Sequence, residues 1–148
     1  MSGPSLGDFL EDLALFTDRQ EKYQFLIETA DRFQEVPPSV AIRPFAKDHK
    51  VTRCESDAYV WAVPLPEGGC KLYYAVENPQ GLSAKSMAVI LDEHLSGHPL
   101  EEILAVSSDL VYAIFGKEIS MGKGQGLMGM VELTKTLARQ TQLSAPGS

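Results

Sequence analysis

The feature that most constrains the fold is a single strand-like stretch enclosed between segments of helical periodicity. Residues 58–63 are aromatic, β-branched or alanine, and residues 73–76 of the segment KLYYAV repeat this character after the turn sequence PLPEGG. Two such runs joined by a glycine-rich turn are typical of an antiparallel hairpin. Residues 51–53 extend the expected sheet, so the sequence predicts a small antiparallel sheet of about three strands.

Two segments before the hairpin have the periodicity of helices. Apolar residues at three- and four-residue steps predict a first helix over residues 5–16. Thr17 and Gln20 have the spacing of a capping box, which predicts the start of a second helix. That helix must end before Pro37, because proline disfavours helix in the preceding residue. Residues 37–50 contain three prolines and a polar run, and they predict an extended connection over the surface.

The sequence after the hairpin predicts three or four further helices. They are expected over residues 87–95, 99–104 and 107–115, with a last helix beginning at Leu127. Before the last helix, residues 121–126 are rich in glycine and favour a flexible lid or a recognition loop. Helices, then strands, then helices in separate runs indicate the α+β class, with the later helices packed on the sheet.

Length, composition and charge exclude several classes of function. The 148 residues, 44% hydrophobic and 22% charged, are typical of one domain over residues 1–148, with an ordered core of about residues 5–141 and a frayed C-terminal tail. Thirteen Lys and Arg against twenty Asp and Glu give a net charge of −7, which repels nucleic acid. No apolar run approaches the roughly 18–20 residues that span a bilayer, and no basic and apolar leader opens the sequence. We therefore expect a cytoplasmic protein without a membrane partner.

Cys54 is the first of two cysteines, and it lies between the long connection and the first clear strand. The cations Lys50 and Arg53 before it favour the nucleophilic thiolate. The carboxylates Glu55 and Asp57 after it oppose a second negative charge. From these residues alone, a reactive thiol and a small buried apolar residue are equally open interpretations.

Cys70 directly follows the glycine-rich turn and opens the second strand. Cysteine is commonly buried, so we expect Cys70 to pack in the core. Roughly ten or more strand residues at ~3.3 Å each separate it from Cys54, so a disulfide between the two is not expected.

The remaining candidate motifs do not predict a metal or cofactor site. His94 and His98 have the four-residue spacing of a metal-binding pair, but Gly97 and Pro99 end the helix there, so we expect a solvated helix C-terminus. His49 stands alone in a polar segment and is expected at the surface. The glycines of residues 122–129 do not match a phosphate-binding loop, and the sequence has no serine elbow, HExxH or CxxC motif.

Four short segments resemble the SufE family of sulfur acceptors in iron–sulfur cluster assembly. They are RQEKY at 19–23 followed by Leu26 and Ile27, VTRCES at 51–56, KSMA at 85–88, and GQGL at 124–127. The resemblance extends over about residues 16–138. The family usually has glycine before the acceptor cysteine and arginine in the C-terminal loop, where this chain has Arg53 and Lys123.

The resemblance implies that Cys54 accepts persulfide sulfur from a pyridoxal-phosphate cysteine desulfurase, stimulates that enzyme, and delivers the sulfur to an iron–sulfur scaffold protein. The chain would be a sulfurtransferase-like accessory carrier with no cofactor or metal of its own. Arg53 and Lys123 would steer or stabilise the anionic sulfur, and Ser56 would form a hydrogen bond near it. The chemistry is that of thiol–disulfide exchange, in which a thiolate attacks a sulfur atom.

Two other functions remain open from the sequence. One is a non-catalytic interaction module in which both cysteines are packing residues. The other is a metal or cluster scaffold, which needs more ligands than Cys54 and the distant histidines provide.

Overall fold

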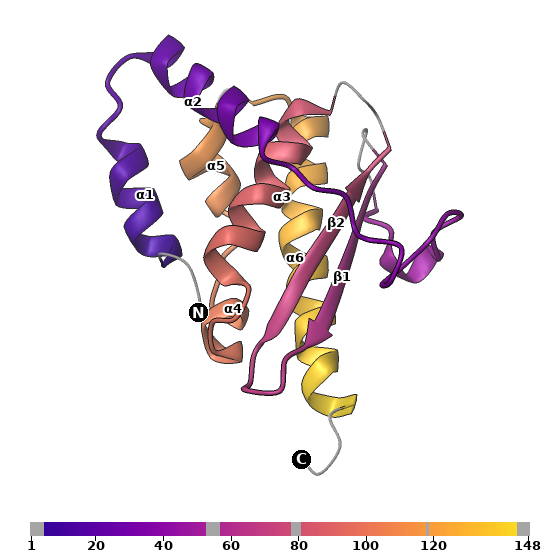
Figure 1. Cartoon of the computed structure of the whole chain (residues 1–148). Coiled ribbons are helices and arrows are strands. Elements are labelled where there is room, and N and C mark those ends of the chain that lie inside the picture. Colours follow the sequence, from indigo (N-terminus) through magenta and orange to yellow (C-terminus); the bar gives the residue numbers. More distant parts are fainter. Residues whose placement is uncertain (1–4, 53–56, 78–80, 118, 145–148) are drawn as a thin grey trace.

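A computed structural model describes residues 5–52, 57–77, 81–117 and 119–144 of the chain (Figure 1). Within these ranges two helices precede a two-stranded antiparallel hairpin, and four helices follow it, which confirms the α+β class. The elements are α1 (Leu6–Ala14), α2 (Arg19–Asp31), the 3-10 turn η1 (Lys47–His49), β1 (Ala58–Pro64), β2 (Cys70–Val76), α3 (Leu82–Leu95), α4 (Leu100–Leu104), α5 (Leu110–Phe115) and α6 (Met121–Ser144).

The sheet has two strands in the described residues rather than the expected three. Its register runs from Ala58 opposite Val76 to Pro64 opposite Cys70. The segment before β1 adds a single antiparallel bridge, between Lys50 and Tyr59, and one backbone hydrogen bond of 2.8 Å from Val51 N to Ala58 O. The side chain of Val51 packs in the core, where it is 1% exposed.

One face of the hairpin packs on α3 and α6 and forms the main core (Figure 1). Side chains alternate along a strand, so Val60 and Leu72 point toward these helices and are fully buried. The Tyr74 hydroxyl lies in the same layer, 2.8 Å from Thr134 Oγ1 of α6. The largest buried apolar side chains on the helices are Met87, Ile90, Leu91, Ile103, Ile114 and Met130.

The other face of the hairpin is covered by the connection between α2 and β1. Trp61 and Ala75 are buried in a second cluster together with Val36, against which Phe45 also packs. The ring centroids of Phe45 and Trp61 are 4.9 Å apart, in an edge-to-face arrangement. The connection runs over the surface as expected, since most of residues 37–50 are exposed, and it also covers the outward-facing aromatic side chains of the strands.

The glycine-rich segment at residues 121–126 is the beginning of α6, so the expected lid or recognition loop is wrong. Glycine weakens a helix by about 1 kcal/mol relative to alanine, which favours the prediction of a loop. Packing overrides this local preference, since Gly124 and Gly126 are buried. A close approach that a side chain would block is found further along α6, at Gly129.

The first two helices are each capped at the N-terminus by a polar side chain that accepts a backbone hydrogen bond, and the cap of the second helix differs from the predicted one. Ser5 Oγ accepts a hydrogen bond from Asp8 N at the start of α1, at 3.2 Å. At the start of α2 the cap is Asp18, whose carboxylate accepts from Gln20 N at 2.8 Å. The predicted capping box of Thr17 and Gln20 is therefore wrong by one residue, because the neighbouring aspartate provides the stronger acceptor.

Candidate functional site

The predicted site belongs to the end of the hairpin where β1 begins and β2 ends. Three of its four predicted residues, Arg53, Cys54 and Ser56, lie outside the described residues. The structure describes the chain up to Thr52 and again from Asp57. These two flanks, and the elements that contact them, are the described surroundings of the predicted site.

The N-terminal flank is fixed against α6 by a contact that requires glycine. A Cβ atom placed on Gly129 would lie 2.8 Å from Val51 Cγ1 and 3.3 Å from Thr52 O. The Val51 side chain is 1% exposed, so it has little space in which to move away. The chain that leads to Cys54 is therefore seated directly on the α6 backbone.

The C-terminal flank begins at Asp57, which has a left-handed backbone with a φ of 48°. Aspartate is one of the few residues other than glycine that adopt this region readily. Its carbonyl oxygen accepts a hydrogen bond from Glu77 N at 3.2 Å, and its carboxylate lies 3.4 Å from Lys50 Nζ. Asp57 thus joins the start of β1 to Glu77, which follows β2, and to Lys50, which precedes the N-terminal flank.

Arg43 ties the same end of the hairpin to the covering connection. Its guanidinium donates to Glu35 Oε2 through Nη1 at 2.9 Å and to Glu77 Oε1 through Nε at 3.0 Å. The hydrogen bonds to Glu35 and then Glu77 raise the pKa of Arg43 above its usual range. The hydrogen bond from Arg43 lowers the pKa of Glu35. One cation therefore joins the residue that follows β2 to two separate parts of the connection between α2 and β1.

Lys123 is the predicted site residue that the structure does describe. It is exposed in the first turn of α6, where its backbone N–H donates to Ser120 Oγ at 3.3 Å. Six residues separate it from Gly129, a rise of about 9 Å along the helix. The N-terminal ends of α3 and α6 lie at the same end of the molecule as the start of β1 (Figure 1). Helix N-termini carry partial positive charge, so Lys123 adds a full charge to a region that favours anions.

Cys70 lies at the opposite end of the hairpin and is not accessible. It is 0% exposed, and burial raises the pKa of its thiol to about 11. Six steps of the register separate the Cys70–Pro64 pair from the Val76–Ala58 pair, a distance of about 20 Å. As the sequence predicts, Cys70 is a packing residue.

The histidines differ from expectation, because they are packed rather than solvated. His94 and His98 are each 7% exposed. The His94 ring lies 4.6 Å from the Phe9 ring, and His98 Nδ1 lies 2.9 Å from Glu102 Oε2. His49 is half-buried against Trp61, with Nδ1 2.8 Å from Val60 O. Among the described residues no group of three His, Cys, Asp or Glu side chains is placed to hold a metal ion.

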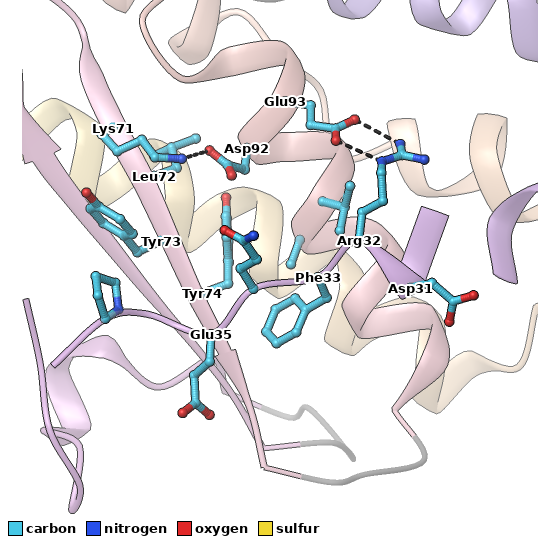
Figure 2. Close-up of a pocket in the computed structure, with 14 residues that line it drawn as sticks. Asp31, Arg32, Phe33, Glu35, Lys71, Leu72, Tyr73, Tyr74, Asp92 and Glu93 are labelled. Carbon is cyan, nitrogen blue, oxygen red and sulfur yellow. Dashed lines mark hydrogen bonds and ion pairs between the residues drawn. The ribbon is translucent and has the colours of Figure 1, made fainter. Parts of the chain in front are cut away.

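A polar pocket of about 600 Å³ lies between the C-terminal end of α2, β2 and α3 (Figure 2). Arg32, which directly follows α2, donates to Glu93 through Nε at 3.0 Å and through Nη2 at 2.9 Å. Lys71 of β2 pairs with Asp92 of α3. Sequence reasoning missed this pocket because its charges come from three separate elements. The described lining contains no cysteine, serine or histidine, so it does not supply the nucleophile that sulfur transfer needs.

Comparison with solved structures places the fold beside that of a protein from Thermus thermophilus. That structure was determined in solution and is described only as that of a hypothetical protein. The two chains align with a TM-score of 0.75 and 23% sequence identity, over 97% of this chain and 99% of the other. Identity at this level shows a shared fold. No curated protein sequence matches the chain.

In the described parts of the chain, no helix is both long and apolar enough to cross a membrane. The family model SufE, described as an Fe-S metabolism associated domain, matches residues 7–138. That range contains the hairpin, the flanks of Cys54 and most of α6. The chain therefore belongs to the SufE family and has a role in iron–sulfur metabolism.

Proposed function

We propose that this chain is a sulfur carrier that accepts persulfide sulfur on Cys54 from a pyridoxal-phosphate cysteine desulfurase. It stimulates the desulfurase and delivers the sulfur to an iron–sulfur scaffold protein. Residues 1–148 act in this proposal as one SufE-like domain. The carrier acts in the cytoplasm, because transfer depends on a free thiol and a reducing compartment keeps thiols free.

The burial of Cys70 is the observation that carries the proposal. The chain has two cysteines, and one of them is 0% exposed with its thiol pKa raised to about 11. A thiol in that state is largely protonated at neutral pH and has no access to a partner's persulfide. In a family associated with iron–sulfur metabolism, this leaves Cys54 as the thiol that can accept sulfur.

The transfer step is a displacement at sulfur. The Cys54 thiolate attacks the outer sulfur of the desulfurase persulfide, a new sulfur–sulfur bond forms, and the bond to the desulfurase cysteine breaks. The desulfurase cysteine leaves as a thiolate, so no oxidant or reductant is required. Its release frees the enzyme for the next turnover, which explains the stimulation. A second displacement, by a thiol of the scaffold, regenerates the Cys54 thiolate.

The flanks support a thiolate at Cys54 in this proposal. Lys50 directly precedes Val51 of the N-terminal flank, and its Nζ lies 3.4 Å from the carboxylate of Asp57 on the other flank. Pairing with Lys50 reduces the negative field that Asp57 exerts on a nearby thiol. Lys123 and Arg53 are proposed to stabilise the anionic sulfur, and Ser56 to hydrogen-bond near it.

The test measures desulfurase turnover and the destination of the sulfur together. The desulfurase is supplied with ³⁵S-labelled L-cysteine and with wild-type chain, Cys54→Ser or Cys70→Ala. Wild type and Cys70→Ala are expected to increase alanine production and to carry label on the peptide that contains Cys54. Cys54→Ser is expected to carry no label and to give no stimulation.

Cys70→Ala serves as the matched control, because it removes the other thiol and creates only a small cavity in the core. Label on the Cys70 peptide, or full stimulation by Cys54→Ser, would contradict the proposal. Circular dichroism spectra of both variants confirm that each is folded before transfer is measured.

A further inference from the structure

An apolar groove of about 430 Å³ lies on the helical side of the molecule, between α1 and the chain that runs from α4 into α5. Leu6 and Leu10 of α1 form one wall. The opposite wall contains Ala105, Val106, Leu110 and Ala113. Leu6, Leu10 and Val106 remain partly exposed although they pack against the core. The groove is thus an extension of the hydrophobic core that reaches the surface.

Carboxylates are frequent in the two segments that form this groove. Residues 5–15 and 99–113 contain six Asp or Glu residues and no Lys or Arg. Glu102 and Asp109 line the groove directly, and Glu11 lies one helical turn after Gly7, which also lines it. Basic side chains that contact these segments from outside include His98 beside Glu102, His94 beside Phe9, and Lys22, whose Nζ donates to Ala113 O at 3.4 Å. The described lining therefore carries two carboxylates and no Lys or Arg at the rim of an apolar groove.

We propose that this groove docks a basic amphipathic helix of a partner protein. The apolar face of the helix would fill the groove between α1 and α5, and its Lys or Arg side chains would face the rim carboxylates. An acidic rim selects for cations and against anionic partners, so charge complementarity identifies the occupant. This binding activity goes beyond the proposed sulfur transfer and does not depend on it.

A helix fits the groove better than an extended peptide does. Both walls are built from helices and the turn that joins them, so the described lining offers no strand edge to which an extended peptide could add by backbone hydrogen bonds. Apolar anchors at three- and four-residue steps are the mode by which helices enter such grooves. Anionic lipid is disfavoured, because a membrane surface attracts basic segments and would be repelled by this rim.

The groove is separate from the end of the molecule that carries the flanks of Cys54. α1 packs on α3 and α5, whereas the hairpin packs on α3 and α6. In Figure 1 α1 and the hairpin lie on opposite sides of α3. A partner helix in the groove therefore leaves the Cys54 end free, and one carrier can hold two partners at once.

The probe is a fluorescent synthetic peptide of about five helical turns, with leucine along one face and lysine on its flanks. One control peptide has the same composition in an order that breaks the helical period, and a second has glutamate in place of lysine. Fluorescence anisotropy is measured with the full chain. We expect the first peptide to bind, the two controls to bind much more weakly, and the affinity to fall as salt screens the charges.

Two variants test whether the peptide binds in the groove. Ala105 is an exposed residue of the groove wall, and Ala105→Lys places a long cation there. This variant is expected to weaken binding about tenfold or more. Glu11→Lys reverses one rim charge and is expected to weaken binding about twofold to fivefold at low salt. The matched controls are Ala46→Lys and Glu67→Lys, which make the same changes at exposed positions outside the groove. Both are expected to bind like wild type.

Each remaining outcome decides against the proposal. Equal binding of the three peptides, or equal weakening by Ala46→Lys and Ala105→Lys, would show that the groove does not recognise a basic helix. A dimer in sedimentation that Ala105→Lys dissociates would show that a second copy covers the groove. Binding to lipid vesicles in preference to the peptide would make the occupant a membrane. Cys54→Ser is expected to bind the peptide normally, which separates this test from that of sulfur transfer.

Discussion

At the scale of single residues, the approach to Cys54 depends on a glycine that sequence patterns do not distinguish from its neighbours. Gly124, Gly126 and Gly129 occur within the same short stretch of α6. Only contact geometry separates them: a Cβ on Gly129 would lie 2.8 Å from Val51 Cγ1, whereas one on Gly124 would lie 3.6 Å from its nearest neighbour, Ile119 Cγ2. The role of Gly129 is to let the flank of Cys54 approach the helix.

This difference predicts opposite effects of one substitution at the two glycines. Gly124→Ala is expected to stabilise the fold by up to about 1 kcal/mol, because alanine favours helix and its Cβ has room. Gly129→Ala is expected to destabilise by about 1–2 kcal/mol, because the clash with buried Val51 exceeds the gain in helix propensity. Urea denaturation of both variants measures the free energies of unfolding. A Gly129→Ala protein more stable than wild type would show that the contact with Val51 is not tight.

At the scale of elements, the hairpin and the helices on either side of it could be predicted because their signals are local. Alternating aromatic and β-branched residues around a glycine turn specify β1 and β2 without reference to the rest of the chain. The start of α6 could not be predicted, since buried glycines become helical through packing. The packing of the connection on Trp61 was missed for a related reason, because this contact joins residues far apart in sequence.

In the candidate site, too, local signals could be predicted from the sequence and contacts between distant residues could not. A resemblance in short segments was enough to predict the family, and position was enough to predict that Cys70 is buried. The roles of Arg43 and Glu77 could not be read from the sequence, because the partners of Arg43 lie 8 and 34 residues away. His94 and His98 were misjudged because the helix end that holds them is covered by α1 and α4, as the contacts with Phe9 and Glu102 show.

The Arg43 cluster makes a prediction about pH at this scale. Its hydrogen bond lowers the pKa of Glu35 from the usual 4.5, so the stabilisation is present above that pH and is lost as the pH falls through the lowered value. Wild type is expected to lose thermal stability below about pH 4.5, and Arg43→Met is expected to lose less over the same range, starting from a lower melting temperature at neutral pH.

Melting curves followed by circular dichroism between about pH 6 and pH 3 measure this difference. Lys47→Met is the control, because it removes an exposed cation from the same connection without touching Glu35. Parallel pH profiles for wild type and Arg43→Met would contradict the assigned coupling. The effect is expected to be modest, since Arg43 and Glu35 are both substantially exposed to solvent.

At the scale of the whole molecule, the fold provides two separate surfaces to which we assign different tasks. The hairpin lies between a helical layer and the connection that covers its outer face, and its open end carries the flanks of Cys54. The helical side presents the acidic groove between α1 and α5. A carrier must meet a sulfur donor and a sulfur acceptor, and a docking surface separate from the transfer end would let one partner remain bound while the thiol engages the other.

The central claim is that a single sulfur atom travels on Cys54. Its most direct test is a single-turnover reaction in which persulfidated desulfurase, freed of L-cysteine, is mixed with a chain that has Cys54 as its only thiol or one that has Cys70 as its only thiol. Intact-mass spectrometry then measures the sulfur that each chain gains. The account predicts one added sulfur on the Cys54 chain and none on the folded Cys70 chain. Sulfur on the Cys70 chain, or none on the Cys54 chain while the donor loses its own, would contradict it.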